Sequence, residues 1–243
     1  MKHRISTDSL AREFRLLRNR IEAEVHAPAV LLVTSATDRD GAGLTAYGLA
    51  ESLSKTHQRT ALLTTSATVA QTEWSSGAPA PRQQRRRASD RLDAGNIKMD
   101  GGGFSIVSVS HERVATISRA NIAELVSDLR AEHDYVVIDG GSLPENTFGL
   151  LLLPSADATL VAFLTGRAQL PADRTMLDTL EKAETKVLGV VMNEQATIDH
   201  FVEQIPKREP GIEREADAPA KVVTPTTFAR RFEVAVPRIG KSG

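Results

Sequence analysis

One stretch of this chain has residue types and spacing that could bind a ligand: a run of small residues that includes two glycines. Residues 34–45 read TSATDRDGAGLT, with glycines at 41 and 43. A glycine-rich turn between a buried strand and a helix lets backbone N–H groups and the positive helix end bind phosphate. The motif for such a loop is G-x-x-x-x-G-K-[ST], and its lysine is missing here. The turn therefore predicts either an anion site built from backbone donors, with Arg39 as the nearby cation, or a plain strand-to-helix connection.

The segments around this turn predict an α/β fold with a mostly parallel sheet. The apolar run at 30–34, the helical pattern at 44–55 and the run at 60–63 form a strand–helix–strand unit, which favours parallel pairing. Further strands are expected at 104–109, 135–138, 158–164 and 187–192. Further helices are expected at 9–24, 117–130, 145–153, 172–183 and 197–204.

Composition divides the chain into three parts. Residues 1–28 hold the first amphipathic helix, 29–205 the α/β domain, and 206–243 a tail rich in proline and charge. Within the domain, 71–103 lacks periodicity, and we expect a mobile insertion with a short helix at 89–92. The tail is also expected to be mobile, with a candidate docking patch at 227–236.

Overall composition excludes several classes of protein. The 243 residues include no cysteine, which excludes disulfides, thiolate metal sites and a cysteine nucleophile. A net charge of −1 and 4% aromatic residues argue against a nucleic-acid coat protein. The six histidines show no metal-ligand spacing, so no metal site is expected. Without a membrane span or signal segment in the sequence, we expect a cytoplasmic protein that reaches the inner membrane only through a partner.

The loop and two later strands resemble those of the bacterial tyrosine kinase (BY-kinase) and capsular exopolysaccharide family. This family is related to the MinD/ParA ATPases, and its loop reads T-S-A-x-P-G-E-G-K-S-T. Residues 34–36 and Gly41 match that loop, 134–139 (DYVVID) match its Walker B strand, and 187–193 (VLGVVMN) match V-L-G-V-V-L-N. The resemblance covers roughly residues 9–193 and implies a three-layer P-loop NTPase fold.

The same alignment shows that the Walker A motif is degenerate. Ala42 stands where the family has lysine, and Gly43 and Leu44 replace its Mg²⁺-binding Ser-Thr pair. Thr64 and Ser66 replace two aspartates of the second strand. Phosphoryl transfer needs such cations and ligands, so we expect no catalytic residues and no ATP or Mg²⁺ cofactor. The positions at which vestigial nucleotide binding could persist are Arg39, Gly41, Ala42, Gly43, Thr45, Asp139 and Asn193.

Two of these residues have a simpler interpretation beside the functional one. Asp139 could order a water or Mg²⁺, or it could be a strand-end residue satisfied by neighbouring N–H groups. Asn193 could face adenine, as its counterpart does in the family, or it could form a turn.

The first helix resembles the family segment E-x-[FY]-R-x-L-R, which packs subunits into a ring. Arg15 and Arg18 match it, whereas Arg12 occupies the glutamate position. Spacing predicts that Leu10, Phe14, Leu17 and Ile21 are buried and that Arg15 and Arg18 project outward. Phe14, Arg15 and Arg18 are therefore the predicted partner-binding residues.

The resemblance implies a pseudoenzyme in the biosynthesis or export of a bacterial surface polysaccharide, such as capsule, exopolysaccharide or holdfast. Its expected partner is a membrane chain-length co-polymerase or a catalytically intact paralogue. One alternative is a weak ATP-dependent tyrosine kinase or ATPase that uses Arg39 and Asp139. The other is a ParA-like positioning or DNA-associated protein that uses the arginines of 82–91. No stable nucleic-acid binding is expected on the leading interpretation.

Overall fold

A seven-stranded sheet organises the chain, with the order β3-β4-β2-β5-β1-β6-β7. The computed structural model describes residues 7–56, 58–66, 97–99, 103–109, 114–143, 145–195 and 197–199. Every pairing in the sheet is parallel except the antiparallel pair β3–β4 at one edge. The strands are β1 Ala29–Ser35, β2 Thr60–Thr64, β3 Ile97–Met99, β4 Ser105–Ser108, β5 Tyr135–Ser142, β6 Ala158–Leu164 and β7 Val187–Asn193.

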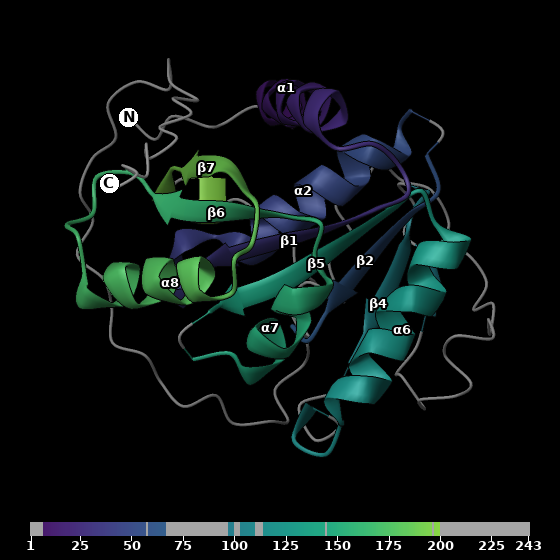
Figure 1. Cartoon of the computed structure of the whole chain (residues 1–243). Coiled ribbons are helices and arrows are strands. Elements are labelled where there is room, and N and C mark those ends of the chain that lie inside the picture. Colours follow the sequence, from purple (N-terminus) through teal and green to yellow (C-terminus); the bar gives the residue numbers. More distant parts are fainter. Residues whose placement is uncertain are drawn as a thin grey trace, which may run out of the picture.

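Helices cover both faces of the sheet, which gives three layers (Figure 1). On one face lie α1 and α2, and on the other lie α6, α7 and α8. The α-helices are α1 Thr7–Glu24, α2 Ala42–Ser54, α6 Arg119–Glu132, α7 Thr147–Leu152 and α8 Pro171–Lys182, and the 3-10 turns are η1 Asp38–Asp40 and η2 Leu153–Ser155. The predicted α/β class with a mostly parallel sheet is confirmed.

Central strand β1 is apolar without alternation because both of its faces are buried. Leu31 and Val33 point into the core under α1 and α2, whereas Val30 and Leu32 point into the core under the other helices. Because both faces of a doubly covered parallel sheet are buried, neither set of positions can be polar. The turn after β1 is thereby held at the middle of the sheet.

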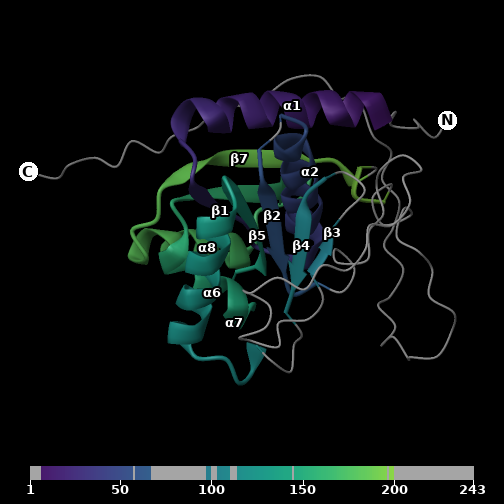
Figure 2. The ribbon, with the colours of Figure 1, turned by 90° about the vertical axis from the view of Figure 1, so that its right-hand side faces the viewer.

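Helix α1 lies across α2 as an outer element rather than on the sheet itself (Figure 2). Leu17 and Ile21 are buried in the same core as α2, and Val25 just after the helix joins them. Within the segment that composition set apart as residues 1–28, α1 and Val25 are thus packed into the core of the α/β domain.

One strand was not predicted from the sequence. β3 lies inside the segment 71–103, which the sequence analysis treated as a single insertion. Its three residues, Ile97, Lys98 and Met99, are too few for a recognisable alternation, and the antiparallel partner β4 supplies the pairing. The possible helix at 89–92, the arginines of 82–91 and the tail from 206 all lie outside the described residues.

Candidate functional site

The candidate site is the turn between β1 and α2, at the carboxyl edge of the parallel strands. β1 pairs with β5 on one side and β6 on the other. Ligands of open α/β sheets bind in the crevice at this edge. The turn consists of residues 36–41, including η1, and α2 starts at Ala42. The geometry that a phosphate loop needs is therefore present.

Gly41 is required by both backbone conformation and space. Its φ of +81° lies in the left-handed region, where residues other than glycine are strained. A Cβ here would also lie 2.8 Å from Asn193 Nδ2 and 3.1 Å from Ile198 Cδ1. Residues from the end of β7 and just beyond it thus pack directly against the loop.

Asn193 binds the loop from the side of β7. Its Nδ2 donates to the carbonyl oxygens of Asp40 at 2.7 Å and Gly41 at 3.3 Å, and to Thr45 Oγ1 at 3.1 Å. Asn193 and Thr45 are both buried. The side-chain amide of Asn193 therefore links the loop to the end of β7.

Asp40 is the centre of the loop and is fully buried, with 0% of its surface exposed. Oδ2 accepts hydrogen bonds from the N–H of Thr37 at 3.0 Å and from Thr37 Oγ1 at 2.9 Å. Oδ1 accepts one from the N–H of Leu164 at 3.0 Å. The carboxylate of Asp40 therefore links the turn to the end of β6.

Arg167 pairs with this carboxylate from the connection between β6 and α8. Its Nη2 lies 3.0 Å from Asp40 Oδ2, and its Nε donates to Oδ1. The same guanidinium bonds Asp173 at the start of α8, with Nη1 2.8 Å from Oδ2, and stacks over Phe163 at 4.9 Å. Bonds to the two carboxylates raise the pKa of Arg167, and the guanidinium in turn lowers the pKa of Asp173.

The charge of this cluster disfavours a phosphate ligand. Two carboxylates and one guanidinium leave a net charge of about −1 beside the loop when all three are ionised. The Arg167 donors that could neutralise a phosphate are taken by Asp40 and Asp173. Ala42 offers no ammonium group, and the Thr45 hydroxyl is bonded to Asn193. Mg-ATP therefore does not fit the residues present.

Asp139 lies at the end of the neighbouring strand β5 and is also internally satisfied. Thr64 Oγ1 donates to its Oδ2 at 2.8 Å, and the N–H of Gly141 donates to its Oδ1 at 3.2 Å. Burial raises the pKa of Asp139, and these two hydrogen bonds oppose that shift only in part. Thr64 stands where the BY-kinase family has an aspartate. Its hydroxyl thus bonds Asp139, the carboxylate that matches the end of the family's Walker B strand. Within the described residues, no cluster of three or more histidine, aspartate and glutamate side chains could hold a metal ion.

The other three predicted loop residues, Arg39, Ala42 and Gly43, do not share a hydrogen-bond network in the described structure. Arg39 lies in η1 and is exposed, whereas the cation that contacts the loop carboxylate is Arg167. Ala42 is buried at the first turn of α2, and Gly43 beside it is half-buried.

Sequence reasoning missed Arg167 and the role of Asp40. Arg167 is 127 residues away from Asp40 and follows a strand without a recognisable motif. The available signal was the acidic pair Asp38 and Asp40 inside a loop that normally binds anions. An acid at such a position needs a cation nearby, and a buried one requires it.

The expectation for helix α1 needs one correction. Leu10, Leu17 and Ile21 are buried as predicted, and Arg15 is exposed. Arg18, however, does not project outward: its Nη1 donates to the carbonyl of Ser52 at 3.1 Å, and 12% of its side chain is exposed. Its long side chain crosses the gap to α2, where backbone carbonyls near the end of the helix attract a cation. Phe14 is half-buried against Gly48 of α2.

Comparison with solved structures identifies the fold. The chain is similar to the kinase domain of the Escherichia coli tyrosine kinase ETK, with a TM-score of 0.61 and 17% identity over 76% of this chain and 75% of that one. It is also similar to the kinase domain of VpsO, with a TM-score of 0.58 and 18% identity over 76% of this chain and 94% of that one. A ParA family ATPase from Chlorobium tepidum matches with a TM-score of 0.51 and 16% identity over 74% and 80% of the chains.

The fold is therefore P-loop NTPase-like and matches that of BY-kinase domains and ParA. No family model matches the chain, and no curated protein matches it in sequence. Within the described residues, no helix is long and apolar enough to cross a membrane.

Proposed function

We propose that this chain is a catalytically degenerate relative of the BY-kinases that acts through protein contacts in bacterial surface polysaccharide synthesis or export. The observation that carries the proposal is a loop with alanine in place of the lysine, whose buried Asp40 is bonded by Arg167 and whose backbone carbonyls accept hydrogen bonds from Asn193. A loop that lacks the lysine, and whose neighbouring arginine is bonded to two carboxylates, has little positive charge to offer a nucleotide.

The kind of pathway is supported by the fold comparison together with the sequence resemblance. BY-kinase domains share the fold, and the sequence keeps their Walker B strand and the strand ending at Asn193. The partner is a membrane chain-length co-polymerase or a catalytically intact paralogue, with α1 as the contact surface. The protein acts in the cytoplasm and reaches the inner membrane through that partner. Capsule, exopolysaccharide and holdfast are the candidate products.

Genetic complementation in the native bacterium tests this function. Deletion of the gene should reduce surface polysaccharide, and wild type and Asp139→Ala should restore it equally. Arg15→Glu should not restore it, although circular dichroism should show an unchanged fold, because it alters the exposed face of α1. Failure of a well-folded Asp139→Ala protein would favour the weak ATPase instead. A deletion strain with normal polysaccharide would contradict the pathway.

A further inference from the structure

Strand β7 forms an open edge of the sheet (Figure 1). It pairs with β6 on one side, and no other strand among the described residues pairs with it. Natural edge strands are commonly protected by proline, by charged side chains or by being very short. The opposite edge, β3, fits that rule with three residues and a lysine at 98. β7 (VLGVVMN) has seven residues without charge or proline, so this edge is open to a further strand.

The backbone of β7 directs its unused groups outward at Val190 and Met192. The carbonyl of Asn193 accepts a hydrogen bond from the N–H of Thr165 at 2.7 Å, on the side of β6. The pairing with β6 is regular up to Asn193, so Val191, two residues earlier, also faces β6. Because successive residues of a parallel strand bond to opposite sides, the N–H and C=O groups of Val190 and Met192 face away from β6. A further strand would bond them there.

Side chains of β7 also leave apolar surface for a neighbour. Val191 is buried, whereas Val187 and Met192 are 43% and 44% exposed. Val190 packs against the core under α6, α7 and α8. Met192 lies on the same face as Val190, because side chains two residues apart in a strand share a face. A strand added at this edge would thus cover apolar surface and bond backbone groups together.

The tail contains a segment with the pattern of such a strand. Residues 230–236 read RRFEVAV and lie between Pro225 and Pro237. Large apolar side chains alternate there with charged or small ones: Phe232, Val234 and Val236 against Arg231, Glu233 and Ala235. This period of two is typical of a strand with one buried face. Its charged residues would give the sheet the protected edge that β7 lacks.

The connection along the chain favours this segment over a second copy or another protein. Residues 194–229 join β7 to it. At about 3.3 Å per residue, this connection can span on the order of 100 Å, several times the length of β7. The segment can therefore reach any position along β7 in either direction. A linked segment also has an effective concentration of up to about the millimolar range, which a separate chain in dilute solution does not reach.

We infer that residues 230–236 pair with β7 as an eighth strand and close the open edge of the sheet. The apolar face of the segment, with Phe232 and Val234, covers Met192 on the side of α8. Its backbone bonds the outward N–H and C=O groups of Val190 and Met192. This inference goes beyond the proposed function and does not depend on it.

Hydrogen exchange of the full chain, followed by NMR, tests the pairing at single amides. Val190 and Met192 should exchange at least tenfold more slowly in the wild type than in Val234→Pro, because proline removes a donor and disrupts the added strand. Val191, which faces β6, should not change. Ala216→Pro is the matched control, since it introduces a proline into the tail outside the segment, and both amides should stay as slow as in the wild type. Circular dichroism should show the same fold for all three proteins.

Protein concentration separates pairing by the tail from pairing between two copies. Protection by the chain's own tail should stay constant over a tenfold range of concentration. Protection that increases with concentration would indicate a second copy and would overturn the inference. It would also be overturned if Val190 and Met192 of the wild type exchanged as fast as unstructured amides, or if their rates were equal in the wild type and Val234→Pro.

Discussion

Asp40 places a buried carboxylate in the turn between β1 and α2. The carboxylate is fully buried and accepts bonds from two backbone N–H groups, a hydroxyl and a guanidinium. A buried ion of this kind is tolerated only when it is paired and its oxygens are bonded. Arg167 is the partner that makes the arrangement possible.

Replacing Arg167 with methionine should destabilise the protein strongly. The substitution leaves Asp40 buried without its cation, and breaking a buried pair in this way costs about 3–5 kcal/mol in the free energy of unfolding. The double variant Asp40→Asn/Arg167→Met should recover part of that loss. Urea unfolding measures all three proteins, and a change below about 1 kcal/mol, the range of a surface ion pair, would show that the pair is not essential.

Asp139 should make stability depend on pH in the opposite sense to a salt-bridged acid. Because burial raises its pKa, the folded state binds this proton more tightly than the unfolded state does. Its contribution to stability is therefore greatest at low pH and decreases as pH rises through the interval between the unfolded and folded pKa values. Asp139→Asn removes that titration.

Urea unfolding of wild type and Asp139→Asn at about pH 4 and pH 8 tests this expectation, since the ordinary aspartate pKa is about 3.9. The asparagine variant should gain stability relative to wild type at the higher pH. Thr64→Val removes the hydroxyl that donates to the carboxylate of Asp139. In that background, the stability gained by Asp139→Asn at the higher pH should be larger than in the wild type. A variant that loses stability at the higher pH would show that Asp139 is held as a favourable charge.

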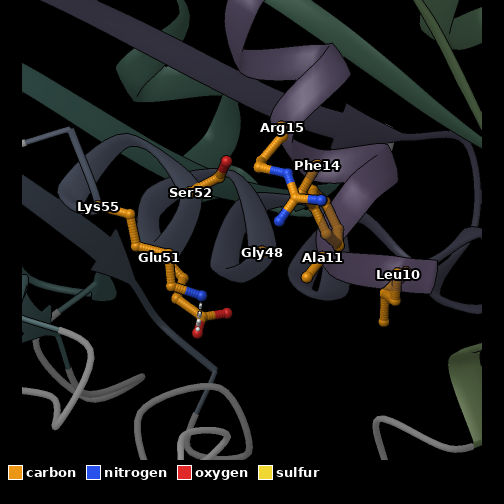
Figure 3. A pocket seen from close by; sticks show the side chains of 8 residues that line it. All are labelled: Leu10, Ala11, Phe14, Arg15, Gly48, Glu51, Ser52 and Lys55. Atoms are coloured by element: carbon orange, nitrogen blue, oxygen red, sulfur yellow. Dashed lines mark hydrogen bonds and ion pairs between the residues drawn. The ribbon is translucent and has the colours of Figure 1, made fainter. Parts of the chain in front are cut away.

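At the scale of elements, the close contact of α1 with α2 depends on a glycine, Gly48, which has no side chain (Figure 3). A Cβ on Gly48 would overlap the ring of Phe14. Alanine is the better helix former by about 1 kcal/mol, yet Gly48→Ala should lower Tm because α1 must move. Phe14→Leu should cost less in the Gly48→Ala background than in wild type. If Gly48→Ala raises Tm, the two helices are not in the close contact described here.

Most elements could be predicted from the sequence because their patterns are local. β1, β5 and β6 are apolar runs of the expected length, and their boundaries differ from the predicted ones by a few residues. Short β3 could not be found, since three residues carry no periodicity and its pairing depends on β4. The 3-10 turn η1 was equally hidden, because a tertiary bond network around Asp40 stabilises it.

The sequence could predict where the candidate site lies in the fold, but not which residues contact one another there. Gly41, Thr45 and Asn193 lie together in the structure, but their hydrogen-bond partners could not be predicted from the sequence. Arg39 was chosen as the cation because it is near in sequence, whereas the fold brings Arg167 to the loop from the connection between β6 and α8. Long-range contacts of this kind are set by topology and leave no local signal.

At the scale of the whole molecule, the three-layer architecture is intact, while the side chains at the loop are bonded to one another: Asp40 to Arg167, and Thr45 to Asn193. A P-loop NTPase-like fold needs its sheet and helices for stability, but phosphoryl transfer needs free donors and cations at one edge. In this chain those groups stabilise the folded state instead. Restoring one of them alone, as in Ala42→Lys, should therefore not restore activity, because the metal ligands replaced at Gly43, Leu44, Thr64 and Ser66 would still be absent.

Equilibrium binding of Mg-ATP to the purified full chain, followed by calorimetry, tests the central claim most directly. No saturable binding is expected for the wild type up to millimolar nucleotide, nor for Ala42→Lys, and neither protein should release phosphate or phosphorylate tyrosine. Saturable binding by the wild type in the micromolar range, abolished by Asp139→Ala in a protein that remains folded, would contradict it.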